Sequence, residues 1–201
     1  MRRTIAFLLV IVLFLASCGS QSSPKTPAES TQDVKYVDLG CCVTGIAVRD
    51  KAVLGANSTT HTKNDFVMTL NSDKKTYKTT DVINLWGTLE YTGGDPSITI
   101  WHGCPFMVFS ISSGEGFKSG GAVVDILTSS SLERKQVYHF DYQKSGSYNT
   151  NDQYWQNFYQ DPVLKLPPGK YTITLMGDFS LSDKVIGSES GLKCTLAITV
   201  K

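Results

Sequence analysis

Residues 192–201 read LKCTLAITVK, and this stretch decides the fold class. Its apolar side chains stand at every second position from Leu192 to Val200, and lysines and threonines occupy most of the positions between them. Successive side chains of a β-strand point to opposite faces of the sheet, so this spacing predicts a strand with one buried and one solvated face. Cys194 falls on the face that we expect to be buried.

Similar runs recur along the chain from Asp65 onward. Apolar residues alternate with polar ones at 66–70, 83–91, 98–101, 136–142 and 171–175, and residues 106–111 are almost continuously apolar. Clusters of turn-forming residues separate these runs, for example at 91–96 and 112–116, and no alternation of strands with helices is visible. Roughly seven or eight short strands divided in this way predict an all-β antiparallel sandwich. One helical turn is expected within residues 151–161, before Pro162.

Residues 166–171, LPPGKY, favour the immunoglobulin-like class of sandwich. They resemble the tyrosine corner, in which a Tyr at the start of a strand hydrogen-bonds back to the preceding loop. Proline fixes the bend of such a loop, and glycine adopts the unusual dihedral angles.

Residues 73–83, DKKTYKTTDVI, are similar to the strand–turn–strand opening of BsuPI-type intracellular proteinase inhibitors and of macroglobulin-like domains. The usual Gly before the acidic residue is missing. The resemblance implies an immunoglobulin-like sandwich over residues 63–201. It implies no function, because sandwiches carry many functions.

The N-terminus has the pattern of a secretory signal. Arg2 and Arg3 precede an uncharged apolar run that is shorter than the ~20 residues of a spanning helix and lacks a basic flank on its far side. Residues 15–18, LASC, resemble the lipobox of bacterial lipoproteins. The resemblance implies that the signal peptide, residues 1–17, is removed and that Cys18 carries lipid. Two or more acyl chains then hold the protein stably on the extracytoplasmic face of the cell membrane. The alternative is an ordinary secretory signal with a chance cysteine.

The next two segments connect this signal to the sandwich. Residues 18–33 comprise Cys18 and a stretch rich in Ser, Thr and Pro without apolar periodicity, which predicts a disordered tether. Residues 34–62 contain two candidate strands, at 34–37 and 43–53. They form either an N-terminal hairpin packed on the main domain or a partly ordered linker.

Four cysteines remain after Cys18, namely Cys41, Cys42, Cys104 and Cys194. Outside the cytoplasm they can oxidise, and three pairings are possible. We favour a Cys104–Cys194 disulfide, which would tie the middle of the domain to its last strand. Cys41 and Cys42 would then form a strained vicinal disulfide or stay reduced. Alternatively, one or both of them reach the other two cysteines, although adjacent strand residues point to opposite faces.

Metal binding and catalysis have little support in the sequence. His102 and Cys104 are ligand types that suit Zn or Cu, but no CxxC, HxxxH or methionine-rich cluster accompanies them. A turn histidine beside a bridged cysteine explains the pair more simply, and we expect no cofactor. The sequence contains no Gly-x-Ser-x-Gly elbow, phosphate-binding loop or His-Glu-x-x-His motif. We therefore expect a protein that is not an enzyme.

Residues 148–159 favour a binding function because they interleave five aromatic residues with amides. Tyr and Trp provide rigid contact area with polar tips, which suits recognition of peptides or sugars. The candidate ligand contacts are Tyr148, Tyr154 and Trp155. The aromatic residues at 155, 158 and 159 also have the spacing of a helical turn that plugs the end of the sandwich.

The charge balance restricts the partners. The 19 basic residues nearly cancel the 18 acidic ones, so the chain has no nucleic-acid footprint and no polybasic membrane patch. We expect a monomeric, lipid-anchored, non-catalytic module that binds a protein or glycan of the bacterial envelope through its end loops. One alternative is a proteinase inhibitor of the BsuPI type, which would present an exposed loop to a protease. Another is a metal-handling lipoprotein that uses His102 and Cys104.

Overall fold

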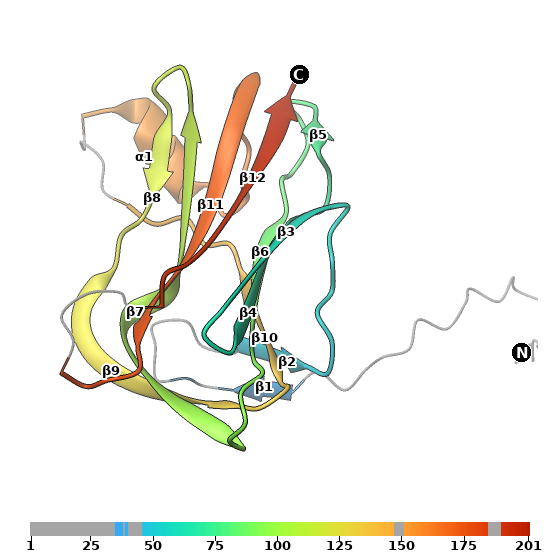
Figure 1. Cartoon of the computed structure of the whole chain (residues 1–201). Coiled ribbons are helices and arrows are strands. Elements are labelled where there is room, and N and C mark those ends of the chain that lie inside the picture. The colour runs from blue at the N-terminus through green and yellow to red at the C-terminus, as the bar shows by residue number, and fades with distance from the viewer. Residues whose placement is uncertain (1–34, 38, 40–45, 147–150, 185–189) are drawn as a thin grey trace, which may run out of the picture. The chain divides into compact units, whose positions relative to one another are not determined.

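The computed structural model describes residues 35–37, 39, 46–146, 151–184 and 190–201, which all belong to the unit Asp33–Lys201. These residues form two facing sheets and one short helix (Figure 1). Sheet A has the order β1 (Lys35–Val37), β2 (Ile46–Arg49), β10 (Val137–Asp141), β6 (Leu85–Tyr91), β4 (Phe66–Ser72) and β3 (Asn57–Lys63). Sheet B has the order β5 (Thr76–Tyr77), β12 (Leu192–Val200), β11 (Gly169–Ser180), β7 (Ser97–Ser113) and β8 (Lys118–Gly120), and β9 (Val124–Glu133) also pairs with β7.

The strand order is that of an immunoglobulin-like sandwich. Strands β4, β6 and β10 take the places of strands A, B and E, and β12, β11 and β7 take those of G, F and C. Neighbouring strands pair antiparallel, except that β5 runs parallel to β12. The predicted all-β antiparallel sandwich is therefore confirmed. Strand β2 of the β1–β2 hairpin occupies the position beside β10 where strand D lies in immunoglobulin domains.

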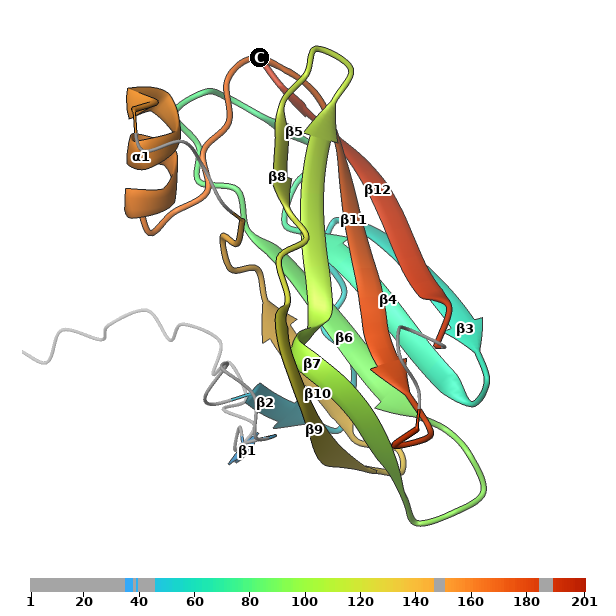
Figure 2. The ribbon, with the colours of Figure 1, turned by 90° about the vertical axis from the view of Figure 1, so that its left-hand side faces the viewer.

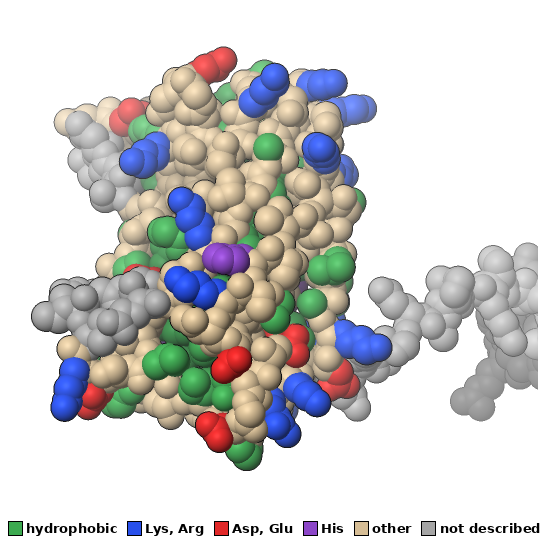
Figure 3. Space-filling view, viewed as in Figure 1, with side chains coloured by type: hydrophobic (Ala, Val, Ile, Leu, Met, Phe, Trp, Pro, Cys, Tyr) green, Lys and Arg blue, Asp and Glu red, His purple; other side chains and the backbone are tan. Residues whose placement is uncertain are grey.

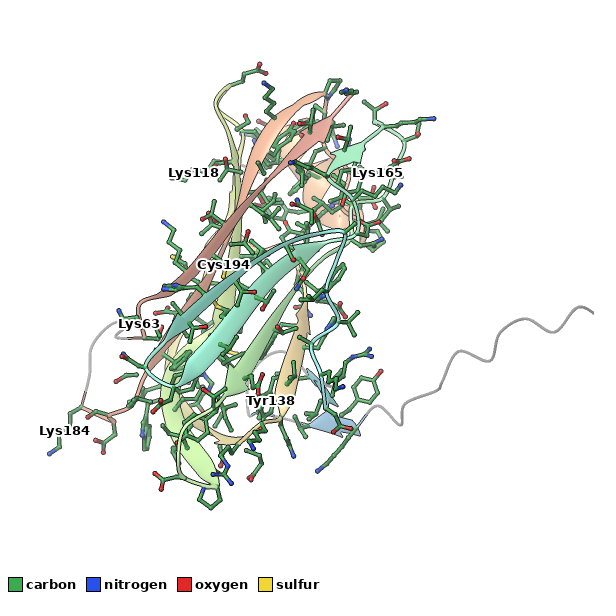
Figure 4. All side chains as sticks on the ribbon, turned by 45° about the vertical axis from the view of Figure 1, so that its right-hand side comes forward. Lys63, Lys118, Tyr138, Lys165, Lys184 and Cys194 are labelled. Carbon is green, nitrogen blue, oxygen red and sulfur yellow. The ribbon has the colours of Figure 1, made fainter. Side chains whose placement is uncertain are left out.

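The core lies between the two sheets and follows the predicted alternation. Every second residue of β12, from Leu192 to Val200, is at most 5% exposed, and the residues between them face solvent. On sheet A, Phe66 packs edge-on against Phe179 of β11, with ring centroids 5.1 Å apart. The side chains drawn in Figure 4 fill the space between the sheets. On the face viewed in Figure 3, basic and acidic side chains are scattered among uncharged ones.

Strand β5 pairs with β12 only at Thr199 and Val200. Side chains of β3 cover the rest of this edge of β12. The Nδ1 atom of His61 accepts a hydrogen bond of 3.1 Å from the backbone N–H of Lys193. The Nδ2 atom of Asn57 donates to the backbone carbonyl of Ala197, also over 3.1 Å. An edge strand with unpaired backbone groups can pair with another chain, so these contacts protect the sandwich from association through this edge.

The motif at residues 166–171 adopts the geometry of a tyrosine corner. The hydroxyl of Tyr171, at the start of β11, donates a hydrogen bond of 2.9 Å to the backbone carbonyl of Pro167. Strand β11 is the counterpart of immunoglobulin strand F, which is where this corner occurs.

The predicted Cys104–Cys194 disulfide is wrong: the two buried cysteines are not bonded to each other. Strand β11 lies between their strands, which places β7 and β12 about 10 Å apart. Cys194 lies opposite Leu175, and Leu175 lies opposite Phe109, five residues along β7 from Cys104. A disulfide needs Cα atoms within about 7 Å. The Cys194 thiol instead donates to the carbonyl of Met68 over 3.4 Å, and burial raises its pKa.

Several predictions concern residues outside the described ranges. They are the signal peptide, the tether with Cys18, the pairing of Cys41 and Cys42, and the role of Tyr148. No helix among the described residues has the length and apolar character that a membrane span requires.

Candidate binding site beside helix α1

Helix α1 (Gln153–Gln160) lies in the connection between β10 and β11, at one end of the sandwich (Figure 2). The carboxylate of Asp152 caps it, because Oδ1 accepts the backbone N–H groups of Tyr154 at 3.0 Å and Trp155 at 3.3 Å. The helix ends at Gln160, and its C-cap Asp161 has the extended backbone that suits a residue before proline. A helix of eight residues is too short to be stable alone, so α1 depends on its packing.

An aromatic cluster attaches α1 to the sandwich. The ring of Phe117, in the turn between β7 and β8, lies 5.1 Å from Trp155, 5.7 Å from Phe158 and 5.6 Å from Tyr171. Phe158 is buried and Trp155 is half-buried, whereas Tyr154 is 46% exposed. Of the predicted ligand contacts, Trp155 therefore packs α1 in place, and Tyr154 faces solvent.

Lys144 holds the C-terminal end of α1. Its ammonium donates to the backbone carbonyls of Phe158, Asp161 and Val163, the last two at 2.8 Å. It also lies 4.3 Å from the ring centre of Phe158. The Phe158 carbonyl belongs to the last turn of the helix and the other two follow it, and a cation at this end is favoured by the helix dipole. Burial lowers the pKa of Lys144.

Two hollows flank this lysine. The larger, of about 370 Å³, lies between α1 and the ends of β6 and β10, and we call it the Trp86 hollow. It is lined by Val82–Trp86, Asp141–Lys144, Tyr159 and Asp161–Leu164. The smaller hollow, of about 270 Å³, is lined by Tyr154, Lys165 and Pro167 among others, and it shares Lys144, Asp161 and Val163 with the first.

Hydrogen bonds within the protein fix the walls of the Trp86 hollow. The indole N–H of Trp86 donates to the carbonyl of Val53 over 2.9 Å, and its ring stacks on His139 at 6.2 Å. The Nε2 atom of His139 lies 3.0 Å from the Asp141 carboxylate and lowers the pKa of that group. The Nδ2 atom of Asn84 donates to Asp73 over 3.2 Å. The walls are therefore ordered without a ligand.

Tyrosine hydroxyls lie beside the hollow. Tyr159 is 3.2 Å from the hydroxyl of Ser119 and donates to the carbonyl of Ser145. Burial raises the pKa of the neighbouring Tyr142 to about 12, so its hydroxyl is neutral at physiological pH. The Tyr142 hydroxyl is also buried, so it adds no charge to the wall of the hollow.

The weak metal candidates His102 and Cys104 lie elsewhere, on β7. The Nδ1 atom of His102 is 2.6 Å from the carbonyl of Gly103, and its Nε2 atom is 2.7 Å from Ser130 Oγ. Both ring nitrogens face protein groups, so neither presents a lone pair to a metal ion. Within the described ranges, no three His, Cys, Asp or Glu side chains group in a way that could hold a metal ion.

No pattern in the sequence pointed to the residues that line the Trp86 hollow. Trp86 and Asp141 lie opposite each other because β6 and β10 pair in that register, although they are far apart in the chain. The only local signal for these two residues is that Trp86 lies near the start of β6 and Asp141 lies at the end of β10. A scan against protein-family models and searches of curated proteins and solved structures found no match to this chain.

Proposed function

We propose that the chain is a lipoprotein anchored on the extracytoplasmic face of a bacterial membrane and that its sandwich is a non-catalytic binding module. The module takes an envelope ligand in the Trp86 hollow. The observation that carries the binding role is this open hollow of about 370 Å³, which has ordered aromatic and polar walls. Its volume lies at the small end of the range of about 300–1,000 Å³ for ligand pockets.

The N-terminal sequence supports the anchor. A basic start, an apolar run and LASC precede a polar segment that would hold the sandwich away from the bilayer. The full chain and a Cys18→Ala variant, both expressed in a bacterium, test this part. We expect the unaltered chain in the membrane fraction, without residues 1–17 and heavier by its acyl chains in mass spectrometry. A Cys18→Ala chain that is processed and anchored like the unaltered one would contradict lipidation.

The binding role is tested with the full chain extracted from membranes in mild detergent. We expect an envelope component to co-purify and to be lost in the Asp141→Asn variant, which keeps the shape of an exposed side chain and removes its charge. Asp95→Asn is the matched control, because Asp95 is exposed in the turn between β6 and β7, at the end of the sandwich away from α1 (Figure 2). Equal retention by the two variants would show that the hollow is not the site.

A further inference from the structure

The lining of the Trp86 hollow combines a fixed aromatic surface with hydrogen-bond acceptors. The N–H of Trp86 is used by Val53, so the indole offers a ligand its ring and not a hydrogen bond. Stacking on His139 holds the ring in one orientation. A rigid ring of this kind suits the apolar C–H face of a flat, compact ligand.

The polar groups at the rim suit hydroxyl groups of a ligand. The side chain of Asp141 is 83% exposed, so its carboxylate can accept hydrogen bonds from outside the protein. The amide of Asn84 donates through Nδ2 to Asp73, which directs its carbonyl oxygen away from that carboxylate. A few acceptors beside an aromatic ring fix the orientation of a polyol more readily than that of an apolar ligand.

The charges that line the hollow disfavour an anionic ligand. Among the described residues that line it, Lys144 is the one cation, and its three N–H groups point at three backbone carbonyls. Two carboxylates, of Asp141 and Asp161, remain. Arg49 lies near enough to Asp141 to lower the pKa of that carboxyl, but it is not a lining residue, so a phosphate, sulfate or uronic acid would meet like charge in the hollow itself, which disfavours its binding.

Building on the function proposed above, we propose that the Trp86 hollow binds an uncharged sugar unit of an envelope glycan. The sugar ring stacks on Trp86, and its hydroxyls donate to Asp141 and Asn84. The volume of about 370 Å³ has room for a short piece of glycan, not for a folded partner. The class of ligand follows from the aromatic ring, the acceptors and the lack of a usable cation among the lining residues together.

The test is isothermal calorimetry on the detergent-solubilised full chain. The probes are tetrasaccharides of glucose, mannose and N-acetylglucosamine, with a galacturonic acid tetrasaccharide as the charged counterpart. We expect saturable binding of at least one neutral probe and weaker binding of the charged one. Trp86→Ala should weaken binding about tenfold or more because the stacking surface is lost, and Asp141→Asn should do the same because a charged hydrogen-bond acceptor is lost. Asp95→Asn should leave it unchanged.

Thermal unfolding of each variant separates lost binding from lost folding. If Trp86→Ala is unfolded, Asp141→Asn alone decides the outcome, since that side chain is exposed. Tighter binding of the galacturonic acid probe, or neutral-sugar binding that Asp141→Asn does not weaken, would overturn the proposal. If no probe binds while co-purification still depends on Asp141, the sugar assignment fails and the binding module stands. If both fail, the hollow is not a binding site.

Discussion

Replacing Lys144 with Met should detach the C-terminal end of α1 from the sandwich. The change keeps most of the apolar length of the side chain and removes the ammonium, which donates to three backbone carbonyls. A hydrogen bond to a charged group contributes about 1.5–3 kcal/mol. Because Lys144 is only half-buried, water can hydrogen-bond some of the carbonyls that the ammonium leaves. We therefore expect a total loss of about 2–4 kcal/mol in the local stability of α1.

Hydrogen exchange followed by mass spectrometry measures this loss. A loss of about 2–4 kcal/mol corresponds to exchange faster by about 30- to 1,000-fold in peptides that cover residues 151–166. The global free energy of unfolding in urea should fall less, because α1 can open while the two sheets remain paired.

Lys165→Met is the matched control. Lys165, labelled in Figure 4, lines the smaller hollow and is exposed. Its replacement removes the same charge near the same helix, and we expect a change within about 0.5 kcal/mol. Equal exchange rates of α1 in the two variants would refute the idea that Lys144 holds the helix end.

Three further predictions concern the sandwich. Tyr171→Phe should lower the free energy of unfolding by about 1 kcal/mol in urea titrations, because it removes the hydrogen bond to the Pro167 carbonyl. Tyr142→Phe, whose buried hydroxyl has no hydrogen-bond partner among the described residues, should cost less, and equal losses would argue against the tyrosine corner. The thiol of Cys194 should resist iodoacetamide in the native protein and react on unfolding without reductant, and protection after unfolding would reveal a disulfide. The pKa of Tyr142 rises from about 10 in the unfolded chain to about 12 in the folded protein. The neutral hydroxyl therefore contributes fully to the free energy of unfolding below pH 10, and this contribution is lost as the pH rises to about 12. Urea titrations at pH 9 to 12 should show that the free energy of unfolding falls with pH, and that it falls less steeply in the Tyr142→Phe variant.

The sequence alone determined the elements whose information is local. The alternation at 192–200 specifies a strand, because each second side chain must leave water, and the burial of β12 follows it position by position. The LPPGKY motif specifies the corner at Tyr171, since the hydrogen-bond partners lie four residues apart. The helix also lies within the predicted residues 151–161, where a capping Asp152 precedes the aromatic spacing.

Only the tertiary structure decided which distant residues meet. Strand order placed β11 between Cys104 and Cys194, so two cysteines that local patterns placed in strands are too far apart to bond. The register of β6 with β10 brought Trp86 beside Asp141. These outcomes depend on pairings between segments far apart in the chain, and the periodicity of one strand carries no information about its neighbour.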